Sequence, residues 1–150
     1  MLSESDTTAG KYLSNHNVLC LATTRDGKPW VSPVFYALWQ GKLIFLSAPH
    51  TRHAQNLLEN PLVSGSIQED YCDWKSIKGI QLEGSVSVVK DEYRDEVIKC
   101  YSGKFPVTGR EAPPEIEKAL AKIHWFQLQP SIMYFIDNSL GLGHRVEIAL

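Results

Sequence analysis

Residues 18–47 read VLCLATTRDGKPWVSPVFYALWQGKLIFLS, and this stretch decides the fold. Three runs within it are rich in apolar and β-branched residues, which predicts strands at 18–24, 30–38 and 43–47. Asp26-Gly27 supplies the positive φ angles that a tight hairpin turn requires, and residues 39–42 form a second turn. We therefore expect the stretch to fold as a three-stranded antiparallel meander.

The period of the apolar residues changes after this meander. Thr51 is a suitable N-cap for a helix that continues to about Asn60, where a following proline disfavours further helical turns. Ala54, Leu57 and Leu58 recur at helical spacing, so we expect them to share one face of this helix.

The remaining patterns add further strands and helices. We expect strands at 62–67, 77–89 and 124–136, and helices at 5–15, 91–102 and 113–122. Gly79, Gly84 and Pro130 predict bulges or bends within the long strands, and Pro33 predicts an edge strand or a bulge. Strands dominate, so the sequence predicts one domain over residues 1–150, mainly β with peripheral helices, of the Greek-key or meander barrel type.

Composition excludes several classes of function. The chain has 150 residues, 43% of them hydrophobic and 21% charged, and its formal net charge is −2. This balance predicts neither a nucleic-acid partner nor a membrane surface. The apolar stretches are too short to cross a bilayer, and no secretory signal begins the chain. Three widely spaced cysteines, Cys20, Cys72 and Cys100, favour a reducing compartment, so we expect a cytoplasmic protein.

Polar side chains gather where the third strand ends and the helix begins. Ser47, Thr51, Arg52 and His53 all fall within seven residues there. The N-terminus of a helix presents unpaired N–H groups, and a guanidinium matches two phosphate oxygens at once. The segment therefore predicts a phosphate site, although Arg52 and His53 could also be solvated residues of an ordinary helix cap.

Several motifs occur in a fixed order that resembles a known superfamily. The meander is followed by TRHAQNL (51–57), NPLVSGSI (60–67) and IKGIQLEGSVSVV (77–89), an order similar to the pyridoxamine 5′-phosphate oxidase-like, FMN-binding split β-barrels. TRHAQ, KGIQLEG, FPV and FIDNSLGLGHR are similar to a small uncharacterised branch of that superfamily. The resemblance implies a homodimer that binds flavin mononucleotide (FMN) in a cleft between its subunits and acts as an oxidoreductase.

The same resemblance implies which residues hold the cofactor. Arg52 and His53 match the basic pair that binds the FMN phosphate, with Thr51 beside them. Gly79 takes the place of a cofactor-binding glutamine, and Gln81 lies two residues on, which puts it on the same face of the strand. Further cofactor contacts are implied on two strands. Those along the flavin ring are Trp30, Val31, Ser32, Pro33 and Val34, and those at the end of the third strand are Leu46 and Ser47.

Departures from the superfamily pattern leave alternatives open. The second basic residue is a histidine, which is neutral over much of the physiological pH range. The substrate-binding arginine and histidine have only a loose match in Gly143-His144-Arg145, so the substrate stays unknown. A haem-binding or haem-degrading barrel using a histidine such as His124 is one alternative, although a lone histidine there is more often a hydrogen-bonded structural residue. A dimeric module that senses flavin or binds a protein is the other, and no metal site is predicted.

Overall fold

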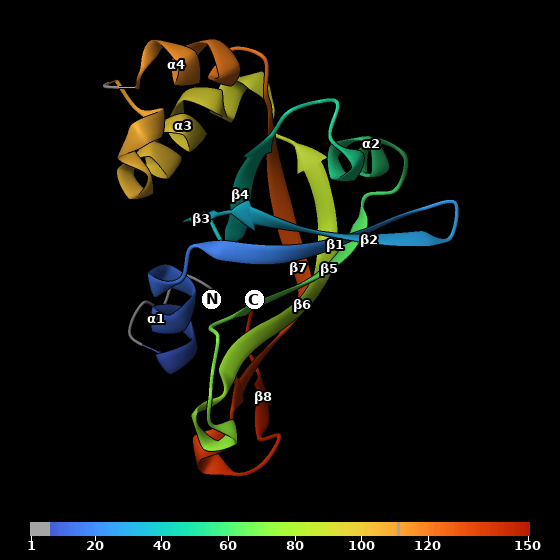
Figure 1. Ribbon diagram of the computed structural model, residues 1–150, viewed down its shortest axis with the longest axis vertical. Coiled ribbons are helices and arrows are strands. Elements are labelled where there is room, and N and C mark those ends of the chain that lie inside the picture. Colours follow the sequence, from blue (N-terminus) through green and yellow to red (C-terminus); the bar gives the residue numbers. More distant parts are fainter. Residues whose placement is uncertain (1–6, 111) are drawn as a thin grey trace.

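The protein is a single curled β-sheet with helices at its margins (Figure 1). The computed structural model describes residues 7–110 and 112–150; the first two residues of the helix predicted at 5–15 lie outside this part. The strands are β1 (Val18–Arg25), β2 (Lys28–Phe35), β3 (Ala37–Trp39), β4 (Lys42–Ser47), β5 (Leu62–Gln68), β6 (Lys78–Val88), β7 (His124–Asp137) and β8 (Arg145–Glu147). The helices are α1 (Thr8–Asn15), α2 (Arg52–Glu59), α3 (Arg94–Lys104) and α4 (Pro114–Leu120), with short 3-10 turns η1 (Trp74–Ser76), η2 (Asp91–Tyr93), η3 (Pro106–Thr108) and η4 (Asn138–Leu140).

The strand order confirms a mainly β fold and corrects the predicted meander. Neighbours in the sheet run β2-β1-β5-β6-β7-β4-β3, with β8 added beside β7. The predicted strand 30–38 is divided at Tyr36: β2 pairs with β1, whereas β3 pairs with β4 at the opposite edge of the sheet. Tyr36 alone joins these two edges, and its hydroxyl donates to the carbonyl of Leu13 at 2.6 Å. The chain therefore forms two hairpins at opposite edges and no meander.

The predicted bulge is present, and both Gly84 and Pro130, the residues that indicated it, lie at it. Pairing between β6 and β7 shifts at Glu83 and Gly84, so that Ser131 is the extra residue and Pro130 faces Gly84. A Cβ atom on Gly84 would overlap the carbonyl oxygen of Gln129, which is why only glycine fits there. Pro33 lies on β2, an edge strand as predicted.

Two apolar clusters hold the sheet in its curl. The larger fills the inside of the sheet, with Leu13, Leu21, Tyr36, Phe45 and Phe126 among its fully buried side chains. The smaller packs α3 against the β3–β4 edge through Ala37, Trp39, Ile44, Val89, Val97, Tyr101 and Trp125. Trp39, predicted in a turn, is therefore the buried end of β3.

Helix α2 docks on the inner side of β1 and β2 through a mixed face. Ala54 and Leu57 are buried, whereas Leu58 is 57% exposed, so the three residues predicted on one face of the helix do not share the same environment. Asn56 takes the third buried position, and its Nδ2 donates to the buried hydroxyl of Thr23 at 3.0 Å. The helical period is right, but the buried stripe is shifted by a polar pair that apolar spacing cannot indicate.

Candidate functional site

The N-terminus of α2 is built by Thr51 and the strand end before it. Thr51 adopts an extended conformation, and its Oγ1 accepts from the backbone N–H of Ala54 at 3.3 Å, which is the geometry of an N-cap. The same hydroxyl donates to the carbonyl of Ala48 at 2.9 Å. The tip of α2 is therefore fixed against the end of β4 by its own side chain.

Ser47 and His53 continue this network. Ser47 Oγ lies 2.9 Å from Thr51 Oγ1 and 2.6 Å from His53 Nε2. Every donor is satisfied if His53 Nε2–H donates to Ser47, Ser47 donates to Thr51, and Thr51 donates to Ala48. In this order His53 is not a base toward Ser47, and burial lowers the pKa of His53. His53 therefore orders the tip as a neutral imidazole.

Among the described residues, no hydrogen bond joins the Arg52 side chain to this network. Its guanidinium lies 4.2 Å from the centroid of the Trp30 ring at the start of β2, a stacked cation–π contact. Within the described part of the chain, no carboxylate lies within ion-pair distance of Arg52. The tip of α2 thus combines an unpaired guanidinium with the positive end of a helix, a combination that suits an anion.

The β2 residues implied to hold a flavin ring divide between two faces. Ser32 and Val34 point inward and are buried, whereas Val31 and Pro33 are exposed on the outer face. Because Pro33 has no N–H to donate to β1, the odd-numbered residues of β2 direct their backbone groups to the open edge. The N–H of Val31 therefore faces away from β1.

Of the two remaining predicted residues, Leu46 lies near the tip of α2 and Gln81 lies far from it. Leu46 is half-buried on β4, beside Ser47 and opposite Trp125. Gln81 is exposed on β6, in the cross-strand row Pro33, Cys20, Ser66 and Gln81 on the outer face. Three strand spacings separate it from Pro33, or roughly 14 Å, so one chain does not bring Gln81 to the tip of α2.

His124 belongs to this region although sequence spacing does not connect it to the tip. It begins β7 directly opposite Ser47, and its Nδ1 is buried with no hydrogen-bond partner within residues 7–110 and 112–150. The expectation that His124 is a hydrogen-bonded structural residue is therefore wrong for Nδ1. Only the β4–β7 register shows this proximity, because 77 positions of chain separate the two residues.

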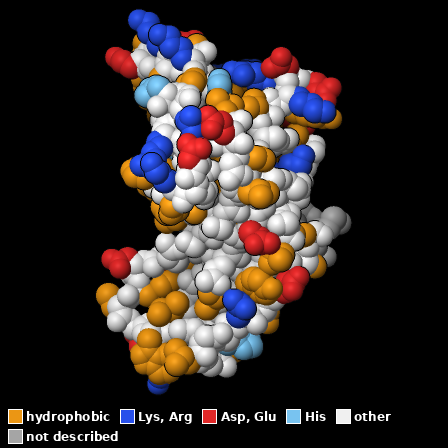
Figure 2. Space-filling view, turned by 90° about the vertical axis from the view of Figure 1, so that its right-hand side faces the viewer, with side chains coloured by type: hydrophobic (Ala, Val, Ile, Leu, Met, Phe, Trp, Pro, Cys, Tyr) orange, Lys and Arg blue, Asp and Glu red, His pale blue; other side chains and the backbone are white. Residues whose placement is uncertain are grey.

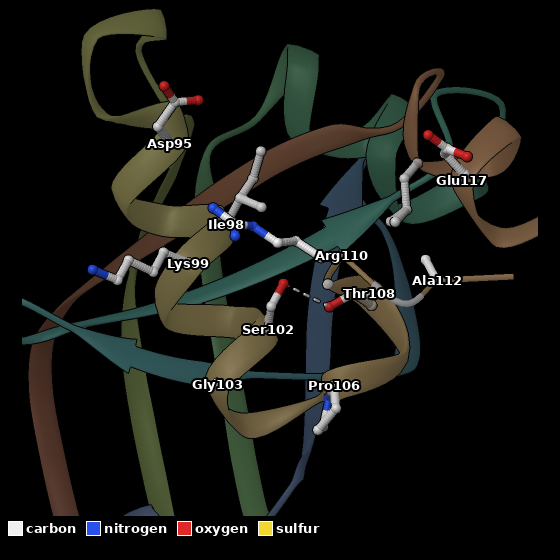
Figure 3. Close-up of a pocket in the computed structure, with 12 residues that line it drawn as sticks. Asp95, Ile98, Lys99, Ser102, Gly103, Pro106, Thr108, Arg110, Ala112 and Glu117 are labelled. Carbon is white, nitrogen blue, oxygen red and sulfur yellow. Dashed lines mark hydrogen bonds between the residues drawn. The ribbon is translucent and has the colours of Figure 1, made fainter.

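A pocket of about 940 Å³ lies elsewhere, between α3 and the η3–α4 segment (Figure 3). Ser102 and Thr108 meet at its centre, with their hydroxyls 3.2 Å apart, and Ile98 forms part of an apolar wall. None of its lining residues belongs to the predicted site. In the described ranges no three His, Cys, Asp or Glu side chains lie together as a metal site, and no helix is long and apolar enough to span a membrane.

The sheet order and the α2 tip together define a split-barrel fold. A family model for pyridoxamine 5′-phosphate oxidase matches residues 6–137, and the chain belongs to this family. A UPF0306 protein of Photorhabdus laumondii is 30% identical over 139 residues, which are 91% of this chain and 90% of that relative.

Solved structures with the same fold bind different groups. HutZ, the heme storage protein of Vibrio cholerae, is 26% identical with a TM-score of 0.70, over 87% of this chain and 92% of HutZ. An FAD-binding protein of Mesorhizobium loti is 22% identical with a TM-score of 0.66, over 82% of this chain and 87% of that one. The fold is therefore shared by flavin-binding and heme-binding proteins.

Proposed function

We propose that this chain binds FMN and serves as a flavin-dependent oxidoreductase whose substrate is unknown. The observation that carries the proposal is the unpaired guanidinium of Arg52 at the N-terminus of α2, held in place by Trp30. Ser47, Thr51 and His53 beside it form a pre-arranged polar surface. A phosphate ester carries the charge and the acceptor oxygens that this donor set matches.

The proposal puts the flavin ring next to this phosphate-binding surface. The open edge of β2 begins at the Arg52–Trp30 stack, and the N–H of Val31 is directed to that edge. The edge of an isoalloxazine ring carries acceptors for such a donor, while its faces require apolar walls. The chain would bind and orient the ring and exclude water from it, while bound FMN would supply the electron transfer. No side chain is assigned a catalytic role.

A second copy of the chain would complete the cleft. The outer face of β1, β2 and β5 exposes Val18, Val31, Phe35 and Leu62, which is unusual for the surface of a monomer. Val18 is paired with Phe35 across β1 and β2, so the two form one continuous apolar strip. A two-fold dimer would bury this strip and cover the open edge of β2. We also propose a cytoplasmic location, as the cysteine spacing suggests.

Loss of the Arg52 guanidinium tests the proposal. Arg52→Ala should weaken FMN binding by about 1.5–3 kcal/mol, the scale of a charge-assisted hydrogen bond, in calorimetric titration. The matched control is Arg25→Ala, because Arg25 is already paired with Glu59 at 2.6 Å at the far end of α2. Equal affinities for the wild type and Arg52→Ala would reject the assigned phosphate site.

Haem is the second candidate, favoured by the similarity to HutZ and by the unpartnered nitrogen of His124. The two candidates differ in colour. Purified protein that carries FMN is yellow and releases a fluorescent supernatant when boiled, whereas bound haem gives an intense Soret band. A Soret band that disappears in His124→Ala, with no flavin released, would replace the FMN proposal by the haem one. Colourless protein that binds neither group would indicate the non-enzymatic module.

A further inference from the structure

The pocket of about 940 Å³ between α3 and the η3–α4 segment, here called the α3–α4 cavity, lies apart from the residues of the proposed flavin site (Figure 3). Val97 and Tyr101 of α3 are buried against the sheet in the smaller cluster, whereas Ile98 and Ser102 line the cavity. The volume is within the range of sites for small organic molecules, roughly 300–1,000 Å³. Helix α3 therefore holds the sheet with one side and borders a cavity of ligand size with another.

Gly103 belongs to the wall of this cavity, and its surroundings do not require a glycine. A Cβ atom added to Gly103 would have no heavy atom within 4 Å, whereas one added to Gly84 would overlap a backbone carbonyl. Gly103 is also not among the glycines with positive φ values. Glycine is a poor helix former, yet this one lies within α3. The missing side chain gives neither a special conformation nor a close approach, but it leaves space in the cavity.

The two hydroxyls at the centre of the cavity have a fixed direction. Thr108 Oγ1 donates its one proton to the carbonyl of Phe105 at 2.8 Å. In its 3.2 Å contact with Ser102 it must therefore accept, and Ser102 Oγ is the donor. A serine whose proton is already used can only accept from a ligand. Ser102 therefore favours a ligand that has an N–H or O–H group.

Arg110 offers the opposite kind of group. Figure 3 shows its side chain extending over the cavity toward Ile98 of α3, above the two hydroxyls. No described carboxylate lies within 4.0 Å ion-pair distance of its guanidinium. A guanidinium has only donors, and its planar fork matches the two oxygens of a carboxylate. Arg110 and Ser102 together suit a ligand that has a carboxylate and a donor group.

Charges of both signs surround the cavity. Two lining residues besides Arg110 and Lys99 are carboxylates, Asp95 and Glu117. None of these four side chains forms an ion pair within residues 7–110 and 112–150. Figure 2 shows both acidic and basic side chains at the upper end of the molecule, the end at which α3 and α4 lie in Figure 1. This mixture favours a ligand with both charges over a simple anion or a simple cation.

The cavity also has apolar walls, to which Ile98 of α3 and Leu120 of α4 contribute half-buried side chains. We propose that the α3–α4 cavity binds a small zwitterion with an apolar body, of which an amino acid with an apolar side chain is the simplest case. The carboxylate would bind Arg110, the ammonium would donate to Ser102 Oγ, and the apolar body would pack on the walls. This site goes beyond the proposed flavin function and does not depend on it.

Three related compounds test the site by NMR titration of the ¹⁵N-labelled protein. L-Phenylalanine carries both charges, 3-phenylpropionate lacks the ammonium, and 2-phenylethylamine lacks the carboxylate. Phenylalanine should shift the amide signals of residues 95–110 and 112–120. It should bind about tenfold more tightly than either of the other two compounds, the effect of one charge-assisted hydrogen bond.

Two variants assign the two charged groups of the ligand. In Arg110→Met, phenylalanine and 2-phenylethylamine should bind equally, because the partner of the carboxylate is gone. In Ser102→Ala, phenylalanine and 3-phenylpropionate should bind equally, because the acceptor for the ammonium is gone. Lys118→Met is the control: it removes an exposed cation of α4 that does not line the cavity, and it should keep the ratios of the wild type.

A third variant fills the cavity. Gly103→Leu should abolish binding of all three compounds without weakening α3, because leucine is the better helix former. Glu96→Leu, at an exposed position of α3 outside the cavity, should leave binding unchanged. Three results would overturn the proposal: no amide shifts with phenylalanine, equal affinity of the wild type for phenylalanine and either other compound, or unchanged binding in Gly103→Leu. No measurement involves FMN, so this proposal and the flavin proposal can fail separately.

Discussion

Helices α1 and α2 are alike in length and capping, but each places a histidine at the opposite end. Both have eight residues, and in both a threonine hydroxyl caps the N-terminus. His53 lies in the first turn of α2, at the positive end of the helix, and burial lowers its pKa. His16 follows the last turn of α1, at the negative end, and bonds a carboxylate. The two histidines therefore have different partners, a pair of hydroxyls at one helix end and a carboxylate at the other.

The two ends also differ in what remains for a ligand. At the end of α1 the protein supplies its own anion, Glu69, and the site is closed. At the tip of α2 the hydroxyls of Ser47 and Thr51 and the ring of His53 satisfy one another, while Arg52 has no anionic partner in the described part of the chain. One end has its anion within the chain, whereas the cation at the other end has none among the described residues, which is the feature that the proposed phosphate site uses.

The largest expected effect is on the packing of α1. Leu13 is fully buried in the main cluster, so Leu13→Ala should lower the free energy of unfolding by about 3 kcal/mol in denaturant titration. Leu58→Ala on α2 is the control, and its change should be within about 0.5 kcal/mol because the side chain is exposed. A small loss for Leu13→Ala would mean that polar contacts, not apolar burial, hold α1.

The docking of α2 should depend on its polar pair. Asn56→Ala leaves the buried hydroxyl of Thr23 without a partner, which should cost about 2 kcal/mol of unfolding free energy. The double variant Thr23→Val with Asn56→Ala should lose less than the two single variants added together, because no unsatisfied hydroxyl remains. Strict additivity in thermal or denaturant unfolding would show that the pair contributes nothing.

The cation beside His16 should make stability rise in mild alkali. Burial lowers the pKa of Lys104 from its ordinary value of 10.5 to about 8. Between these two values the unfolded chain binds more protons than the folded protein, so the free energy of unfolding rises with pH. We expect a gain of about 1 kcal/mol, since solvent screens this half-buried group. Burial raises the pKa of Tyr101 to about 12, so stability should fall again above about pH 10.

Unfolding titrations from pH 7.5 to 10 measure this gain. Lys104→Met should flatten the rise, whereas Lys99→Met, on the exposed side of the same helix, should keep it. A rise of the same size in Lys104→Met would assign it to another group.

The smallest effect concerns His53 and the FMN phosphate. Because burial lowers the pKa of His53, affinity for FMN should be flat from pH 8 to 6.5 and rise below that range, when the imidazolium forms. The rise should be roughly threefold by pH 5.5, the scale of one partly screened charge. Titrations of His53→Gln with FMN should show no such rise. An identical pH dependence of the affinity in the two proteins would show that His53 does not contribute to phosphate binding.

Local sequence signals predicted much of the fold. Asp26 and Gly27 indicated the β1–β2 hairpin, and both have positive φ values. Gly84 and Pro130 each indicated a bulge, and they proved to be the two sides of the same one. These features depend on a few adjacent residues whose backbone is restricted, and such restrictions are visible in the sequence.

The long-range strand pairing could not be predicted from the sequence, because it depends on contacts between distant residues. The run 30–38 is uniformly strand-like, and nothing in it shows that hydrogen bonding passes from β1 to β4 at Tyr36. Leu58 fits an apolar helix face as well as Leu57 does, and the Asn56–Thr23 bond that decides between them joins residues 33 positions apart.

The candidate site shows the same division. Ser47, Thr51, Arg52 and His53 are neighbours in sequence and lie together, whereas the stacking of Trp30 on Arg52 and the position of His124 opposite Ser47 need the folded sheet. Gln81 was placed by resemblance, and its contact with a cofactor stays a prediction.

The prolines of β2 have a consequence for the behaviour of the protein in concentrated solution. An uncovered edge strand can accept a strand from a neighbouring molecule and seed aggregation. On β2 the backbone groups of residues 29, 31, 33 and 35 face outward, and two of these four positions are proline. An incoming strand would find amide donors only at Val31 and Phe35, too few for a continuous ladder. Replacing Pro29 and Pro33 would therefore expose the chain to edge-to-edge polymerisation.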